Sequence, residues 1–105
     1  MVAKEKKRYD EQMLFLRLGI AWACRYIVES DGRCVLVWRH NDLIDLIDKE
    51  NFWPAFKRIN GNLIVHKDRL VSLLVQRPNS ELTNVLLRAG KEIAKERMKN
   101  FHKNG

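Results

Sequence analysis

The residues best suited to hold an anion lie in the middle of the chain. They are cations, amides and a histidine within residues 57–69: Lys57, Arg58, Asn60, His66, Lys67 and Arg69. Arginine forms paired hydrogen bonds with phosphate or guanine, and asparagine forms them with adenine. We therefore expect this segment to contact phosphates and, through Arg58 and Asn60, base edges.

The charge of the whole chain agrees with an anionic partner. Its 105 residues contain 20 Lys and Arg against 13 Asp and Glu, a formal net charge of +7. Such a charge favours partners rich in phosphate or anionic lipid. The length and the 46% apolar composition suit one ordinary core. We expect a single domain over residues 1–105, with residues 1–8 as a flexible basic tail.

The remaining reactive side chains do not form a catalytic or metal-binding pattern. Cys24 and Cys34 lack a CxxC spacing and a nearby histidine cluster, so we expect two buried, reduced thiols and no metal. His40, His66 and His102 have no nucleophile or paired carboxylate at a catalytic spacing, and no glycine-rich phosphate loop is present. We expect no catalytic residues, no cofactor and no small-molecule substrate, and hence no enzyme.

The first apolar run does not have the pattern of a signal peptide or a membrane span. Residues 13–28 follow a charged segment and contain Arg17 and Arg25. We expect no membrane partner and a cytoplasmic, nucleoid-associated location.

Apolar periodicity predicts the elements that precede the basic segment. Residues 9–28 carry two neighbouring apolar stripes and are expected to form one long helix. Residues 30–33 have turn chemistry, and Cys34–Trp38 is rich in strand-forming side chains. Asn41 is placed to cap a helix over residues 42–49.

The basic segment itself is predicted to form a helix followed by two strands. A helical apolar face is indicated by spacings of three and four among Phe52, Ala55, Phe56 and Ile59. A helix over residues 52–60 would turn Lys57, Arg58 and Asn60 outward and end at Gly61. Residues 63–65 and 70–75 are then expected to be strands joined by a turn at residues 66–69.

Ser80 is expected to cap a final helix that combines an apolar stripe with a basic ridge. The stripe consists of Leu82, Val85, Leu86, Ala89, Ile93, Met98 and Phe101. Gly90 lies in the middle of this helix and predicts a close approach to another backbone near Gly19. The apolar first and last helices predict a homodimer.

This order of elements resembles a winged helix-turn-helix domain over residues 9–100. The resemblance implies an α+β fold of order α-β-α-α-β-β-α with a small antiparallel sheet. Residues 52–60 would be the recognition helix in a major groove, residues 42–49 its support and residues 66–69 the tip of a wing on the DNA backbone. It further implies a small homodimer that binds double-stranded DNA, as a regulator or accessory factor in transcription, plasmid partition, transfer or phage recombination.

A second alignment resembles small excisionase-like winged domains. There Asn60-Gly61 is a hairpin turn of type I′ geometry, and Asp68 caps a helix over Leu70, Leu73 and Leu74. Both alignments imply DNA binding. The functional alternative is a winged-helix module that binds a partner protein through its first and last helices, without contacting DNA.

Overall fold

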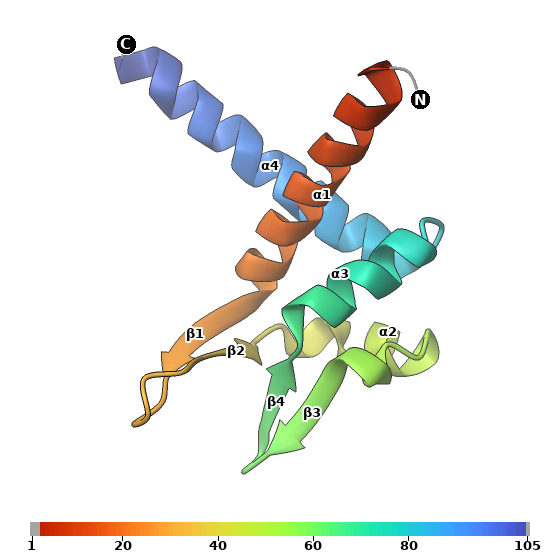
Figure 1. Cartoon of the computed structure of the whole chain (residues 1–105), viewed down its shortest axis with the longest axis vertical. Helices are drawn as coiled ribbons and strands as arrows, with labels where there is room; N and C mark the ends of the chain where they lie inside the picture. Colours follow the sequence, from red (N-terminus) through yellow and green to blue (C-terminus); the bar gives the residue numbers. More distant parts are fainter. Residues whose placement is uncertain (1–2, 105) are drawn as a thin grey trace.

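The computed structural model describes the backbone of residues 3–104 and the side chains of residues 8–99. Its elements, in chain order, are α1 (Ala3–Ala23), β1 (Cys24–Val28), β2 (Cys34–Trp38), η1 (Asn41–Leu43), α2 (Ile44–Lys49), η2 (Trp53–Ala55), β3 (Phe56–Ile59), β4 (Asn62–Val65), α3 (Lys67–Gln76) and α4 (Glu81–Asn104). The strands form one antiparallel sheet of order β1-β2-β4-β3. Figure 1 shows α1 and α4 crossing above the sheet. The expected α+β class and antiparallel sheet are confirmed, whereas the order of elements differs from the expected one.

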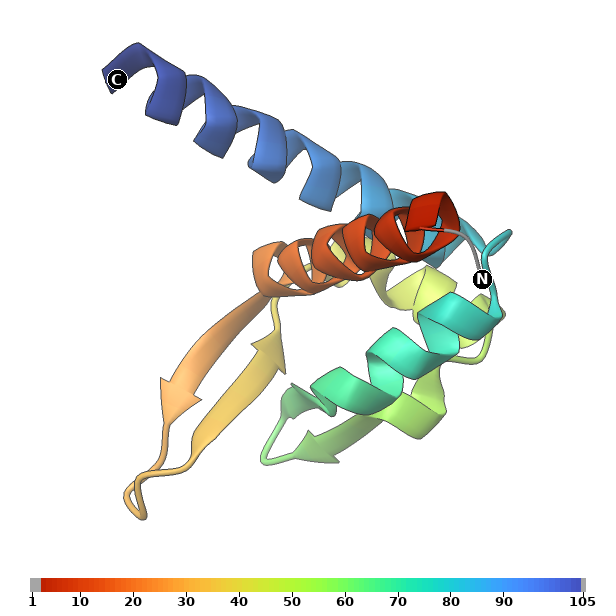
Figure 2. The ribbon, with the colours of Figure 1, turned by 45° about the horizontal axis from the view of Figure 1, so that its top comes forward.

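The core lies between one face of the sheet and the helices. The largest side chains with almost no exposure come from the helices and the segments that join them: Ile20, Ile47, Phe52, Leu70, Leu74, Leu82 and Leu86. They pack against Leu36, Trp38, Leu63 and Val65 from the sheet. Figure 2 shows that the β1–β2 hairpin extends away from the crossed helices.

The expected first helix was wrong at both ends. Cys24–Val28 is strand β1, because it pairs with residues 34–38 along its whole length, from Cys24 opposite Trp38 to Val28 opposite Cys34. The tight turn at Gly32, whose N–H donates to the Glu29 carbonyl, closes this hairpin. Residues 3–8, expected as a flexible tail, belong to α1.

The expected recognition helix over residues 52–60 was also wrong. Pro54 lies in the single 3-10 turn η2, after which Phe56 is extended with φ −127° and ψ 153°. Residues 56–59 then pair with residues 62–65 across a turn in which Asn60 and Gly61 have φ 51° and 81°. Positive φ at both central residues is the type I′ geometry that suits a two-residue hairpin. The helical spacing of apolar residues arose because a short turn and a strand meet at Phe56.

The expected wing turn and returning strand form a helix instead. The Nδ1 atom of His66 accepts a hydrogen bond from the Arg69 N–H at 3.2 Å, so His66 caps α3 and Asp68 does not. Leu70, Val71 and Leu74 form the buried face of this helix. Hairpin, turn and helix therefore follow the order of the excisionase-like alignment.

The expected start of the helix after Asn41 needs a smaller correction. Asn41 opens the 3-10 turn η1, and α2 begins only at Ile44, without a side-chain cap. Ser80 does cap α4, because its Oγ accepts a hydrogen bond from the Thr83 N–H. The side chains of Phe101 and His102 lie outside the described residues.

The predicted close approach of Gly90 to another backbone is confirmed within one chain, and its contact is Phe15, one turn before Gly19. A Cβ atom at Gly19 would overlap the backbone carbonyl of Leu86, and one at Gly90 would overlap that of Phe15. Two helices can cross this closely only where side chains are absent from the contact. The crossing therefore fixes α4 across α1 (Figure 1).

Hydrogen bonds from Glu50 and Arg77 hold the loop between α3 and α4 against the end of α2. The Glu50 carboxylate accepts hydrogen bonds from the Ser80 hydroxyl and from the backbone N–H groups of Glu81 and Leu82. Arg77 donates to the backbone carbonyls of Glu50 and Asn51. Burial alone would raise the pKa of Glu50, but the donors from Leu82, Glu81 and Ser80 lower it below its ordinary value.

Candidate functional site

Strand register divides the sheet into a covered face and an open face. The covered face contributes Cys24, Leu36, Trp38, Leu63 and Val65 to the core. Side chains alternate along a strand, so the intervening residues point to the opposite side. We call that side the open sheet face, and its residues are Arg25, Ile27, Val35, Val37, Lys57, Ile59, Asn62 and Ile64. In Figure 1 strands β3 and β4 face the viewer without a helix in front of them.

One row of residues crosses the open sheet face from edge to edge. Arg25 on β1 is opposite Val37 on β2, Val37 is opposite Ile64 on β4, and Ile64 is opposite Lys57 on β3. The two outer strands thus present cations, and the two inner strands present apolar side chains. With neighbouring strands about 4.8 Å apart, the two cations stem from backbones roughly 14 Å apart.

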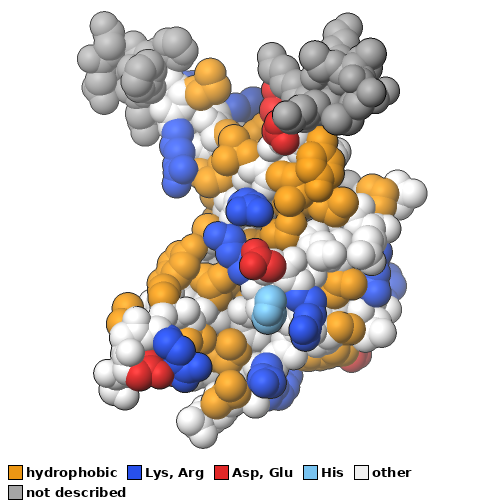
Figure 3. Space-filling model, viewed as in Figure 1, with side chains coloured by type: hydrophobic (Ala, Val, Ile, Leu, Met, Phe, Trp, Pro, Cys, Tyr) orange, Lys and Arg blue, Asp and Glu red, His pale blue; other side chains and the backbone are white. Residues whose placement is uncertain are grey.

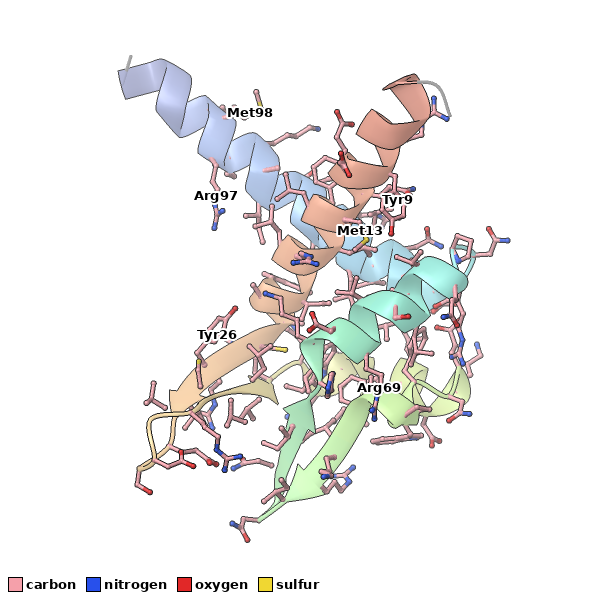
Figure 4. The ribbon with its side chains drawn as sticks, in the orientation of Figure 1. Tyr9, Met13, Tyr26, Arg69, Arg97 and Met98 are labelled. Carbon is pink, nitrogen blue, oxygen red and sulfur yellow. The ribbon has the colours of Figure 1, made fainter. Side chains whose placement is uncertain are left out.

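His66 and Arg69 extend this basic surface at the start of α3. Together with Lys57 they line a shallow recess of about 290 Å³ beside Ile64. Arg69 is held there by a hydrogen bond of 3.2 Å from Nη1 to the Pro54 carbonyl, and Figure 4 shows it below α3, directed toward β3. Figure 3 shows basic side chains and a histidine over this part of the surface. Three of the residues expected from the sequence are therefore brought together.

The other three expected residues lie apart from this group. Arg58 follows Lys57 in β3 and so starts from the other side of the strand, with its guanidinium 5.6 Å from the ring centre of Trp53. Asn60 is exposed at the hairpin tip. Lys67 is half-buried beside Tyr26 and Cys34. Burial raises the pKa of the Cys24 thiol to about 12, and the positive charge of Lys67 acts in the opposite direction.

Two basic residues of this surface were missed from the sequence. Arg25 was included in the expected first helix, and Arg39 was not among the expected site residues. The signal that identifies them is the two-residue alternation of a strand. Cys24 and Tyr26 in β1, and Leu36 and Trp38 in β2, lie on one side of the sheet, so Arg25 and Arg39 lie on the other. This alternation becomes visible once residues 24–28 are paired with residues 34–38. Arg39 continues this ladder, since its N–H donates to the Ala23 carbonyl.

Few carboxylates offset these cations. Among the side chains of residues 8–99, ion pairs are formed only by Arg33, with Glu29 at 3.0 Å and Asp31 at 2.7 Å. Both pairs lie in the β1–β2 turn. The open sheet face contains no acidic residue, so its cations are available to an outside anion.

Other kinds of site find less support in the described residues. His, Cys, Asp and Glu side chains do not gather there in threes as metal ligands. Cys24 and Cys34 are both free, and Cys34 is exposed, which corrects the expectation that both thiols are buried. None of the described helices is long and apolar enough to cross a membrane.

A second basic surface runs along the outer side of α4. Arg88, Lys91, Lys95 and Lys99, at spacings of three and four, are exposed there, and Arg97 is exposed on another side of the helix. Exposed Glu92 and Glu96 are interspersed among them. The ridge is therefore mixed in sign, whereas the open sheet face is not.

Comparison of the chain with protein-family models, curated proteins and solved structures finds no match. The functional conclusion therefore depends on the geometry and charge of the chain itself.

Proposed function

We propose that this protein binds double-stranded DNA through the open sheet face. The observation that carries the proposal is the row Arg25, Val37, Ile64 and Lys57, with a cation at each edge and apolar side chains between. The major groove is about 12 Å wide and admits a two-stranded β-ribbon, which here would be the inner strands β2 and β4. Cations whose backbones are roughly 14 Å apart can reach phosphates on both sides of such a groove.

The central side chains suit the floor of the groove. Ile64 is half-buried and offers apolar surface there, whereas Val37 is only 4% exposed and presents almost no surface to a ligand. Apolar side chains contact the methyl group of thymine in the major groove. His66 and Arg69 would add backbone contacts beside β3, and Asn60 and Asn62 lie at the hairpin end, where an amide could meet a base edge.

This docking mode replaces the helix that was expected to enter the groove, because residues 52–60 are a turn and a strand. Of the two resemblances, the excisionase-like one agrees with the hairpin and the helix that follows it. A regulatory or accessory role in transcription, partition or recombination, in the cytoplasm, rests on that resemblance and stays a prediction. A homodimer stays a prediction as well.

The proposal is tested by titrating labelled duplex DNA with wild-type protein and with Arg25→Ala/Lys57→Ala at several salt concentrations. Each lost phosphate contact should lower the slope of log affinity against log salt by about 1. We expect the double variant to bind more weakly and with a slope flatter by about 2. The matched control is Arg88→Ala/Lys95→Ala on α4, which removes the same charge and should leave a slope close to wild type.

A protein-interaction module is the alternative, supported by the exposed apolar side chains of Leu14 (53% exposed) and Met98 (62% exposed) on the crossed helices. Its signature would be wild-type protein that binds duplex DNA weakly even at low salt. Equal losses in the two double variants would instead indicate a diffuse basic surface.

A further inference from the structure

A separate recess opens where strands β2 and β4 part. Their pairing consists of Leu36 with Val65 and Val37 with Ile64, and it does not continue to Trp38 and Arg39. Beyond Val37 the two strands diverge, and a recess of about 530 Å³ lies between the end of β2 and the hairpin tip at residues 61–63. Binding pockets for small ligands span about 300–1,000 Å³, so the recess has room for a nucleotide-sized group.

Three arginines from different strands or strand ends line this recess. Arg25 belongs to β1, Arg39 follows β2 and Arg58 belongs to β3. Asn41 and Asn62 add amide groups, and the lining contains no carboxylate. None of the three arginines takes part in an ion pair with a described side chain. The recess therefore collects positive charge without an internal counter-ion.

Neighbouring contacts restrict the side chain of Arg58 and the backbone of Arg39. Arg58 lies over the Trp53 ring, and the Trp53 indole N–H donates to Asp48 at 3.0 Å, which fixes the ring. The backbone of Arg39 is fixed by its hydrogen bond to the Ala23 carbonyl. A guanidinium that is already positioned loses less freedom when it binds, and its planar fork of N–H donors matches phosphate oxygens.

The apolar part of the lining strengthens the attraction. Val37, Trp38 and Leu63 are buried and Ile44 is half-buried, so one wall of the recess excludes water. Charge interactions are stronger beside such a wall than in open solvent. Guanidinium and amide donors that line one recess next to an apolar wall suit a phosphate group carried by a larger molecule.

We propose that this recess binds a phosphate group through Arg25, Arg39 and Arg58. Because it adjoins the open sheet face at Arg25 and Val37, a DNA backbone lying on that face supplies such a group, and in that respect the inference rests on the proposed function. A free phosphate presents the same chemistry, so the two sources need separate measurements.

The first measurement follows the arginine side-chain Nε–Hε signals by NMR as inorganic phosphate is added at constant ionic strength. We expect saturable shifts of Arg39 and Arg58 in the wild type. Arg39→Lys and Arg58→Lys keep the charge but lose the planar fork, and each should weaken phosphate binding about tenfold. Arg97→Lys on α4 is the control and should leave the affinity unchanged.

The second measurement titrates duplex DNA against Arg39→Ala, Arg58→Ala and Arg97→Ala at several salt concentrations. Each recess variant should flatten the salt slope by about 1, and the control should not. If phosphate binds but the wild type does not bind DNA, the proposed function fails and the recess serves a free phosphate. If DNA binds but the recess variants match Arg97→Ala in both measurements, the recess proposal is overturned and the proposed function stands. The arginine-to-lysine variants retain the charge and packing stem, so a folding defect in an alanine variant does not remove the test.

Discussion

The adjacent side chains Lys57 and Arg58 have separate roles because neighbouring residues of a strand point to opposite faces of the sheet. Lys57 lies on the open sheet face with His66 and Arg69, whereas Arg58 lies over Trp53 and lines the three-arginine recess. The sequence identifies these cations as candidates by residue type. It does not group them correctly, because a helix would have placed Lys57 and Arg58 on one surface and a strand does not. Arg25 and Arg39 join the surface only through pairing between distant segments.

Glu50 provides a residue-level prediction with a defined pH dependence. Its carboxylate accepts three hydrogen bonds from the start of α4, so Glu50→Gln should lower the free energy of unfolding by about 1 to 3 kcal/mol at pH 7. The folded-state pKa of Glu50 is lowered. Its contribution is therefore present above the ordinary glutamate pKa of about 4.3 and is lost as the pH falls through the folded value.

Urea unfolding of wild type and Glu50→Gln at pH 7 and in acid measures this difference. The gap between the two proteins should narrow at low pH, and Glu92→Gln on the exposed side of α4 should show no such gap. A gap that is the same at both pH values would mean that Glu50 acts through packing and not through its charge.

The hairpin tip gives a second prediction about single residues. Gly61 has φ 81° in open space, so Gly61→Ala changes the backbone energy without adding a clash. An L-residue in the left-handed region costs about 1 to 2 kcal/mol, and thermal unfolding should show that loss. Asn60→Gly, which accepts the same region freely, is the control and should unfold at nearly the wild-type temperature. Equal stability of Gly61→Ala and wild type would contradict the type I′ turn.

Strand pairing overrides the local pattern of apolar residues in two segments that were wrongly predicted to be helical. Residues 24–28 continue an apolar run and residues 52–59 show helical spacing, yet residues 24–28 and 56–59 become strands because a partner strand lies one tight turn away. Conversely, residues 70–75 are rich in leucine and valine, but His66 caps them into a helix. The α+β class, strand β2 and the α4 cap could be predicted, because each depends on local chemistry. The glycine contact joins distant helices, but it could be predicted because a glycine inside a helix is costly unless another backbone comes close. Pairing could not, since it depends on segments far apart.

The crossing of α1 and α4 is the element-level feature most sensitive to a single methyl group. Gly90→Ala gains about 1 kcal/mol of helix propensity, but its Cβ overlaps the Phe15 carbonyl, which belongs to a backbone and cannot rotate away. Overpacking costs typically 1 to 3 kcal/mol and occasionally more. We therefore expect a net loss of up to about 2 kcal/mol in chemical denaturation. Arg88→Ala, two residues away on the exposed side, should stay within about 0.5 kcal/mol, and a stabilised Gly90→Ala would contradict the close crossing.

The molecule as a whole leaves apolar side chains uncovered on the crossed helices. Figure 4 shows Met98 on the side of α4 toward the gap between α4 and α1, with Tyr9 and Met13 on the side of α1 above α3. Because α1 and α4 already pack on each other, a second copy would have to use these outer parts and not the glycine crossing.

Sedimentation at micromolar concentration should show a species of twice the chain mass, and Met98→Glu with Leu14→Glu should shift it to one chain mass. Arg97→Glu, on the opposite side of α4 from Met98, is the control for added negative charge. A wild-type protein that sediments only as a single chain would remove the homodimer.

The central claim is that the open sheet face, and not the α4 ridge, meets DNA. Backbone amide shifts of isotope-labelled protein, followed by NMR as duplex DNA is added at moderate salt, locate the contact directly. We predict that the largest shifts fall on Arg25, Val37, Lys57 and Ile64, which form one row across the sheet. Shifts confined to residues 88–99 of α4, with the sheet unaffected, would contradict the claim.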